Sequence, residues 1–150
     1  MWRFISLFVV VLAVLFGIEK LNVVQAAAIY PWTSFLAWFS AALMTVLDAD
    51  VIRYGRIIQS QATGFGVSIE AGCNGVEAVI ILMAGMVAFP APMRLKLIGV
   101  LIGCVAVQAA NILRVISLYY LGKWDKEVFD FAHLYLWQAL IMLDVLVVWL

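Results

Sequence analysis

Histidine occurs once in the 150 residues, cysteine twice and proline three times, and charged residues make up only 12% of the chain. One histidine and two cysteines outside any Cys-x-x-Cys pair do not supply the ligands of a structural metal site, and two cysteines are too few for a disulfide scaffold. The sequence has no run of basic residues and no glycine-rich phosphate loop after a strand. We therefore expect no metal, no cofactor and no nucleic-acid partner.

Apolar residues, by contrast, make up 67% of the chain, well above the roughly 45–50% of soluble domains. This composition predicts an all-α integral membrane protein, with residues 1–150 as a single membrane domain. A bilayer core requires about 20 apolar residues in a helix. The apolar runs predict about five transmembrane helices, near residues 4–24, 29–47, 74–89, 97–121 and 129–150. The third is short, and we interpret the first as a retained helix rather than a cleaved signal peptide.

Residues 51–70 differ in character from the apolar runs that flank them. The segments 51–58 and 65–70 favour strands, and the polar segment 59–64 separates them. An open two-stranded edge would leave backbone groups unsatisfied in lipid. We therefore expect a short extracytoplasmic β-hairpin that leads into the third span.

The segment Glu70–Glu77 is rich in small and polar residues and lies directly before the third apolar run. Asn74 is a suitable helix N-cap, and the Glu77 carboxylate three residues later can reach back to the N–H of the cap. Cys73 would then lie beside the positive end of the helix dipole, which favours a reactive thiolate. A lone cysteine is also commonly an inert buried side chain, and both interpretations remain open at this point.

Antiparallel connections through short loops bring three polar residues to one membrane surface. Counting about 1.5 Å per residue from Arg94 and Lys96 places Arg114 about 25 Å along the fourth span, at the level of Cys73. Asn111 lies one turn before Arg114, and His133 lies in the first turns of the last span. The alternatives are that Arg114 is a snorkelling anchor and that His133 is an ordinary boundary residue.

Two acidic residues require separate interpretation. Asp144 lies about 16 Å below His133, near mid-membrane, and shares a helix face with His133 and Trp137. A carboxylate is costly at that depth, so we interpret Asp144 as a buried structural acid or a group that supports the site. Glu77 is expected to be a cap or a partner for Arg114 rather than a catalytic base.

These residues resemble the exosortase/archaeosortase family, and exosortase H in particular. The resemblance is carried by Gly72-Cys73-Asn74-Gly75, by Asn111-Ile112-Leu113-Arg114-Val115-Ile116 and by His133 at the start of the last helix, and it covers roughly residues 50 to 140. It implies a membrane cysteine protease of transpeptidase type. The substrates would be exported proteins with C-terminal sorting signals (PEP-CTERM-like), each made of a short motif, a hydrophobic helix and a basic tail.

The resemblance also implies roles for the residues. Cys73 attacks the scissile carbonyl, His133 protonates the leaving amine, and Arg114 holds the carbonyl or stabilises the oxyanion. A thioester follows, which a surface glycan or lipid acceptor resolves by transfer, or water by hydrolysis. The expected partners are thus the sorting-signal helix, membrane lipid and the acceptor, while the oligomeric state stays open. Four further residues are expected to bind substrate or support the site: Asn74, Glu77, Asn111 and Trp137.

Because substrates of this class are exported, we expect a multi-pass protein of the bacterial inner membrane with its site facing the periplasm. A count of lysine and arginine in the loops favours the reverse orientation. Two other functions remain open. One is a small transporter or proton relay through Glu77, Arg114, His133 and Asp144, and the other is a non-catalytic assembly subunit.

Overall fold

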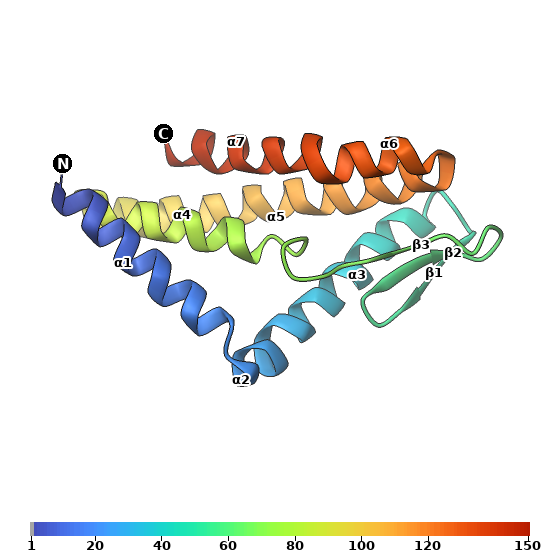
Figure 1. Cartoon of the computed structure of the whole chain (residues 1–150), viewed down its shortest axis with the longest axis horizontal. Helices are drawn as coiled ribbons and strands as arrows, with labels where there is room; N and C mark the ends of the chain where they lie inside the picture. Colours follow the sequence, from blue (N-terminus) through green and yellow to red (C-terminus); the bar gives the residue numbers. More distant parts are fainter. Residues whose placement is uncertain (1) are drawn as a thin grey trace.

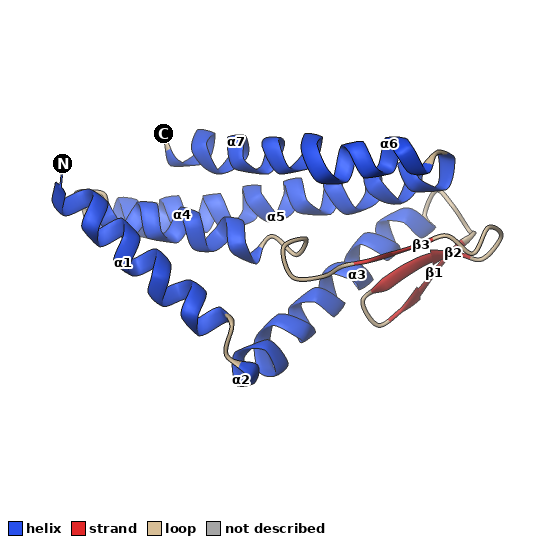
Figure 2. Ribbon diagram, in the orientation of Figure 1, coloured by secondary structure: helices blue, strands red, loops and turns tan. Residues whose placement is uncertain are grey.

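The structure, a computed structural model, describes residues 2–150. Its helices run mostly along one long axis, with a small antiparallel sheet near one end (Figures 1 and 2). The helices are α1 (Trp2–Glu19), α2 (Asn22–Val24), the π-helical segment η1 (Gln25–Ile29), α3 (Tyr30–Thr45), α4 (Val76–Ala88), α5 (Met93–Trp124), α6 (Lys126–Phe131), the π-helical segment η2 (Ala132–Leu136) and α7 (Trp137–Trp149). The strands are β1 (Val51–Tyr54), β2 (Ile57–Ser60) and β3 (Gly66–Ser68).

Four helical stretches are long and apolar enough to cross a bilayer. They are Trp2–Glu19, Asn22–Thr45, Met93–Trp124 and Lys126–Trp149. The apolar α4 has only 13 residues, about 20 Å of helix, and is the short span expected from the sequence. The predicted fold class, an all-α membrane protein with a small sheet before the third apolar run, is confirmed.

The boundary between the first two spans differs from the prediction. The first helix ends at Glu19 instead of continuing to residue 24, and the second begins at Asn22 instead of residue 29. The bend is closed by Gln25, whose Nε2 donates to the backbone oxygen of Glu19 at 2.8 Å and to its carboxylate at 3.2 Å. The polar residues of this stretch thus join two helices at a bend, with the Glu19 side chain buried.

Past this bend, α3 does not return alongside α1. In Figure 1, α1 runs from the N-terminus to α2 near the middle of the long axis, and α3 continues from there toward the sheet. α1 packs against α4, whereas α3 packs against β1, β2 and α5. The molecule therefore has two ends, one built from α1, α4, α7 and the start of α5, the other from α3, the sheet, α6 and the end of α5.

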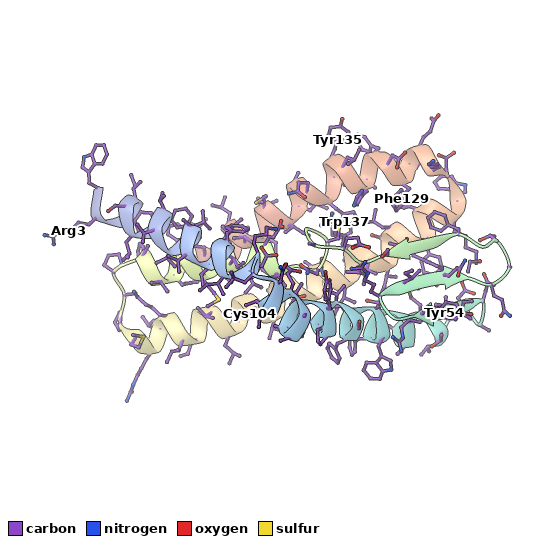
Figure 3. All side chains as sticks on the ribbon, turned by 60° about the horizontal axis from the view of Figure 1, so that its bottom comes forward. Arg3, Tyr54, Cys104, Phe129, Tyr135 and Trp137 are labelled. Carbon is purple, nitrogen blue, oxygen red and sulfur yellow. The ribbon has the colours of Figure 1, made fainter. Side chains whose placement is uncertain are left out.

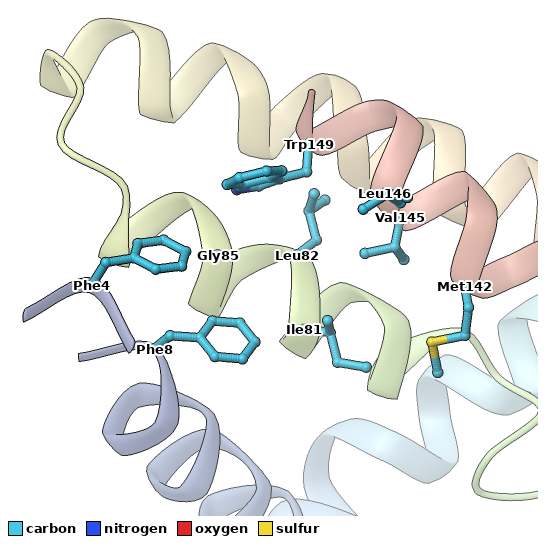
Figure 4. A pocket seen from close by; sticks show the side chains of 9 residues that line it. All are labelled: Phe4, Phe8, Ile81, Leu82, Gly85, Met142, Val145, Leu146 and Trp149. Carbon is cyan, nitrogen blue, oxygen red and sulfur yellow. The ribbon is translucent and has the colours of Figure 1, made fainter. Parts of the chain in front are cut away.

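Buried side chains form three apolar cores. The first joins α3, the sheet and α5 through residues such as Leu36, Ile58 and Tyr119. The second joins α4, α5 and α7, and the third joins α5 to η2 and α7. α1 and α7 also enclose an apolar cavity of about 320 Å³ against α4, lined in part by Phe4 and Trp149 (Figure 4). All three cores contain residues of α5.

The predicted hairpin is a three-stranded sheet of order β1-β2-β3. The run 51–58, predicted as one strand, is divided by a turn at Gly55, whose φ of 58° is a conformation that favours glycine. Val51 pairs with Ser60, and Ile57 with Ser68. The sheet is fastened to α5, because the ring of Phe65 packs where Gly122 has no side chain.

Candidate active site

Residues 69–75, here the cysteine loop, connect the sheet to α4. The loop turns sharply at Gly72 and Gly75, whose φ values are 84° and 74°. A Cβ at Gly75 would also lie 2.8 Å from Nε2 at the flexible end of the Gln108 side chain on α5, so it is the positive φ that calls for glycine here. The Cys73 N–H donates to the Glu70 carbonyl at 3.0 Å, which fixes the backbone that carries the thiol.

The predicted capping box at Asn74 and Glu77 does not form. Gly75 is the N-cap of α4. Asn74 lies one position before this cap, and its side-chain oxygen accepts a hydrogen bond of 3.0 Å from the Val76 N–H. The left-handed turn at Gly75 places Asn74 outside the helix, and no hydrogen bond joins the Glu77 carboxylate to the Asn74 N–H in the part of the chain that the structure describes. Glu77 instead lies 4.0 Å from Nζ of Lys20, and it makes no ion pair with Arg114 within residues 2–150.

Cys73, Arg114 and His133 come together at the cysteine loop. The Cys73 sulfur lies 3.3 Å from Nε2 of His133 and 3.7 Å from Nη2 of Arg114. The other terminal nitrogen of Arg114 donates to the Gly72 carbonyl at 3.5 Å. All three side chains line one cavity of about 130 Å³, together with β3 and Phe129. A nucleophile, a base and a cation thus surround a space where a reacting carbonyl can sit.

His133 is held in place by aromatic side chains. Its ring stacks on Phe129, with centroids 5.5 Å apart and planes 14° from parallel. Phe65 from the sheet meets Phe129 edge to face at 5.9 Å, so the packing of the sheet extends to the imidazole. Trp137, one turn after His133, is buried in the third core, and Figure 3 shows Phe129 and Trp137 pointing inward while Tyr135 projects away.

The π-helical segment η2 contains His133. A single π turn inserts one extra residue and shifts the helix face that follows it, and such turns often occur at functional sites. The segment lets Phe129 of α6 and His133 of η2 line the cavity while Trp137 of α7 packs into the third core. The sequence predicted His133 and Trp137 on one face, but it gave no sign of the π turn between them.

The electrostatics of Cys73 differ from the prediction. Burial of the thiol raises its pKa above the ordinary value. The nearby Arg114 charge lowers it, and the Glu77 and Glu70 carboxylates raise it again. These effects favour the neutral thiol at rest, opposite to the predicted preference for a thiolate, and the reactivity of Cys73 stays a prediction. α4 begins only at Val76, and the thiol is half-buried, so burial opposes the effect of the helix dipole on the pKa of Cys73.

Two polar side chains of α5, Asn111 and Arg114, are buried in the structure. Arg114 is 3% exposed, and Asn111, one turn earlier, is fully buried. Within residues 2–150, Nε of Arg114 and both polar atoms of the Asn111 side chain have no hydrogen-bond partner, and neither has Nδ2 of the buried Asn74. Asn111 does not line the cavity at Cys73. It shares the buried side of α5 with Arg114, as predicted from their spacing.

Asp144 lies in α7 outside the cavity at Cys73. Its side chain is half-buried, and one carboxylate oxygen has no hydrogen-bond partner in the described part of the chain. The structure therefore connects Asp144 to neither His133 nor Arg114. No group of three or more His, Cys, Asp or Glu side chains within residues 2–150 is arranged to hold a metal ion.

Several residues that shape the site were not singled out from the sequence. The indole of Trp32 on α3 donates to the Asn74 carbonyl at 3.4 Å, across 42 positions of sequence. No local pattern could have indicated this contact. Phe129, by contrast, lies one helical turn before His133, and that spacing alone could have suggested it as a neighbour.

Comparison with known proteins gives one family. The family described as Transmembrane exosortase matches residues 1–149, nearly the whole chain. Searches of curated proteins and of solved structures gave no match.

Proposed function

The chain belongs to the transmembrane exosortase family, and from this premise we propose that it is a membrane cysteine protease of transpeptidase type that cleaves C-terminal sorting signals of exported proteins. Membership supports sorting-signal processing by a membrane protein in general. The observation that carries the specific chemistry is the position of the Cys73 sulfur, 3.3 Å from His133 and 3.7 Å from Arg114 in a shared cavity.

The first step is acylation of Cys73. Because burial keeps the thiol neutral at rest, Nε2 of His133 takes the thiol proton as the sulfur attacks the scissile carbonyl carbon. The carbonyl oxygen becomes an oxyanion, and the Arg114 guanidinium beside the sulfur stabilises it. The protonated His133 then gives its proton to the leaving amine. The carbon–nitrogen bond breaks, and a thioester to Cys73 remains.

The second step resolves the thioester. An amine or hydroxyl of a glycan or lipid acceptor, or water, attacks the thioester carbonyl while His133 removes its proton. The sulfur leaves and recovers a proton from His133, which restores the neutral pair. The Arg114 guanidinium serves both tetrahedral intermediates, because the carbonyl oxygen occupies the same position in each.

The dimensions of α5 favour a site at the membrane boundary. The helix has 32 residues, about 48 Å, which exceeds the roughly 30 Å of a hydrocarbon core. With the basic residues Arg94 and Lys96 at one surface, Arg114 reaches the level of the other surface. The remaining turns of α5, together with α6 and the sheet, then lie outside the hydrocarbon core. We propose that this surface faces the periplasm of a bacterial inner membrane, because the substrates are exported.

The test is co-expression with a substrate that carries a C-terminal apolar helix, followed by mass analysis of its new C-terminus. We expect cleavage by the parent chain, complete loss with Cys73→Ala, and retention with the matched variant Cys104→Ser. A thioester adduct on Cys73 that hydroxylamine releases would identify the intermediate. Undiminished cleavage by Cys73→Ala would contradict the proposal. It would favour the transporter or assembly-subunit functions, neither of which needs this thiol.

A further inference from the structure

β3 is an edge strand, and its free side can be assigned residue by residue. The Ser60 N–H donates to the Phe65 carbonyl, and the Ile69 N–H donates to the Arg56 carbonyl. Antiparallel ladders alternate along a strand, so the backbone groups of Phe65, Val67 and Ile69 face β2. The N–H and C=O groups of Gly66 and Ser68 therefore point away from β2, to the side where no further strand lies within residues 2–150.

The residues of β3, the strand with this free edge, line the cavity at Cys73. Residues 66–69 form one wall of that cavity, and the thiol, the imidazole and the guanidinium form another. The side chain of Ser68 is drawn toward the Glu70 carboxylate, to which it donates at 2.7 Å, and Glu70 in turn pairs with Arg56 at 3.0 Å. The backbone groups of Ser68 are not engaged by these contacts.

We propose that the recognition segment of the substrate binds in extended form along β3, as a fourth strand of the sheet, and so delivers its scissile carbonyl to Cys73. This inference rests on the proposed function, whose substrate is a peptide. An unpaired strand edge is a ready template for an added strand, and peptide-binding domains commonly use this mode. Backbone pairing with Gly66 and Ser68 would fix the height and direction of the peptide, whatever its side chains.

Strand addition also explains why a sheet stands at this point of a helical protein. A peptide that leaves a transmembrane helix has unsatisfied backbone groups in the segment next to it. The Gly66 and Ser68 groups supply partners for them at the boundary of the membrane. Because successive side chains of a strand point to opposite faces, every second side chain of the bound segment would face the cavity at Cys73. Specificity would then depend on those side chains.

The direct test is peptide binding to the Cys73→Ala protein, which separates recognition from cleavage. Ser68→Pro removes the outward N–H and places a ring on the free edge, but it removes no ladder bond to β2. Arg53→Pro is the matched control. The β1–β2 register turns the Arg53 N–H outward in the same way, on the opposite edge of the sheet.

We expect Ser68→Pro to weaken binding of a fluorescent sorting-signal peptide in nanodiscs by about tenfold or more, and Arg53→Pro to change it by less than about twofold. Thermal unfolding followed by tryptophan fluorescence shows whether each variant is folded. Equal binding by a folded Ser68→Pro protein and its parent would overturn the inference. Cleavage by the chain with Cys73 intact would still stand as the independent test of the proposed function.

A second measurement changes the peptide and leaves the protein intact. Methylating one backbone nitrogen at a time removes one donor at a time, and a strand pairs with its neighbour through every second residue. We expect affinity for the Cys73→Ala protein to fall at alternate positions and to persist at those between. Equal losses at all positions, or losses without alternation, would exclude strand addition even if variants at Ser68 do not fold.

Discussion

The charge of Arg114 should control how readily Cys73 reacts in the absence of any substrate. The guanidinium lowers the pKa of the thiol, against the opposing effect of burial. Replacing Arg114 by glutamine keeps a polar but shorter side chain, and it removes the charge together with the contact to the Gly72 carbonyl. In a Cys104→Ser background, where Cys73 is the single thiol, we expect Arg114→Gln to raise the pKa of Cys73 further and to slow its alkylation.

The magnitude follows from the distance between the two groups. At 3.7 Å, two unit charges interact by about 1 kcal/mol in water and about 4 to 5 kcal/mol at an effective dielectric constant near 20. Cys73 is only half-buried, so the true value lies between these limits. Because about 1.4 kcal/mol corresponds to a factor of ten in an equilibrium constant, loss of this attraction should raise the pKa of Cys73 and disfavour the thiolate. Below the pKa, the thiolate fraction then falls by about tenfold to a thousandfold.

The assay is the rate of alkylation by iodoacetamide, a small uncharged reagent, as a function of pH in detergent or nanodiscs. Arg94→Gln, at the far end of α5, removes an arginine that is remote from the thiol and should leave the profile in place. Glu77→Gln should act with the opposite sign, because the Glu77 carboxylate raises the pKa of Cys73. An unchanged profile for Arg114→Gln, or one that shifts to lower pH, would refute the electrostatic reasoning.

Three further predictions concern the surroundings of the site. Phe129→Leu removes the ring stacked on His133, so the cleavage rate should fall by about tenfold while the alkylation profile of Cys73 stays near that of the parent. The pKa of Asp50 is lowered to about 2, mainly by its hydrogen bond from Lys123 and then by the one from Ser60. The ionised carboxylate therefore stabilises the fold above the unfolded pKa of about 4, and this stabilisation is lost as the pH falls toward 2. The melting temperature of Asp50→Asn should therefore lie below that of the parent at neutral pH and converge with it in acid, and a constant difference at all pH values would contradict this assignment. A Cβ at Gly103 would clash with the Leu82 side chain of α4 and lie 2.9 Å from a Val148 methyl of α7, so Gly103→Ala should lower the free energy of unfolding by about 1 to 3 kcal/mol. An unchanged midpoint in chemical unfolding would show that these contacts of α5 can relax.

The convergence of Cys73, Arg114 and His133 could be predicted because it depends on helix lengths and on short connections. A rise of 1.5 Å per residue and two tight loops leave little freedom in where the polar ends of neighbouring helices meet. The structure places all three side chains around one cavity, as that reasoning required. The catalytic roles of these three residues are predictions that the experiments described above test.

What could not be predicted depends on tertiary packing. The course of α3 away from α1 follows from its contacts with the sheet, which have no local signal in a mostly apolar run. The state of the Cys73 thiol depends on how much water reaches it, and burial is a property of the folded chain. The turn at Gly55 that divides the first predicted strand could have been predicted, because a glycine inside a strand pattern commonly marks a break.

α5 contributes to each of the three apolar cores, through Val107 to one, Val115 and Tyr119 to another, and Leu118 to the third. It also carries Arg114 between those contacts. Both ends of the molecule are therefore positioned against this one helix. The guanidinium that contacts the Cys73 sulfur therefore projects from the helix that all three cores share.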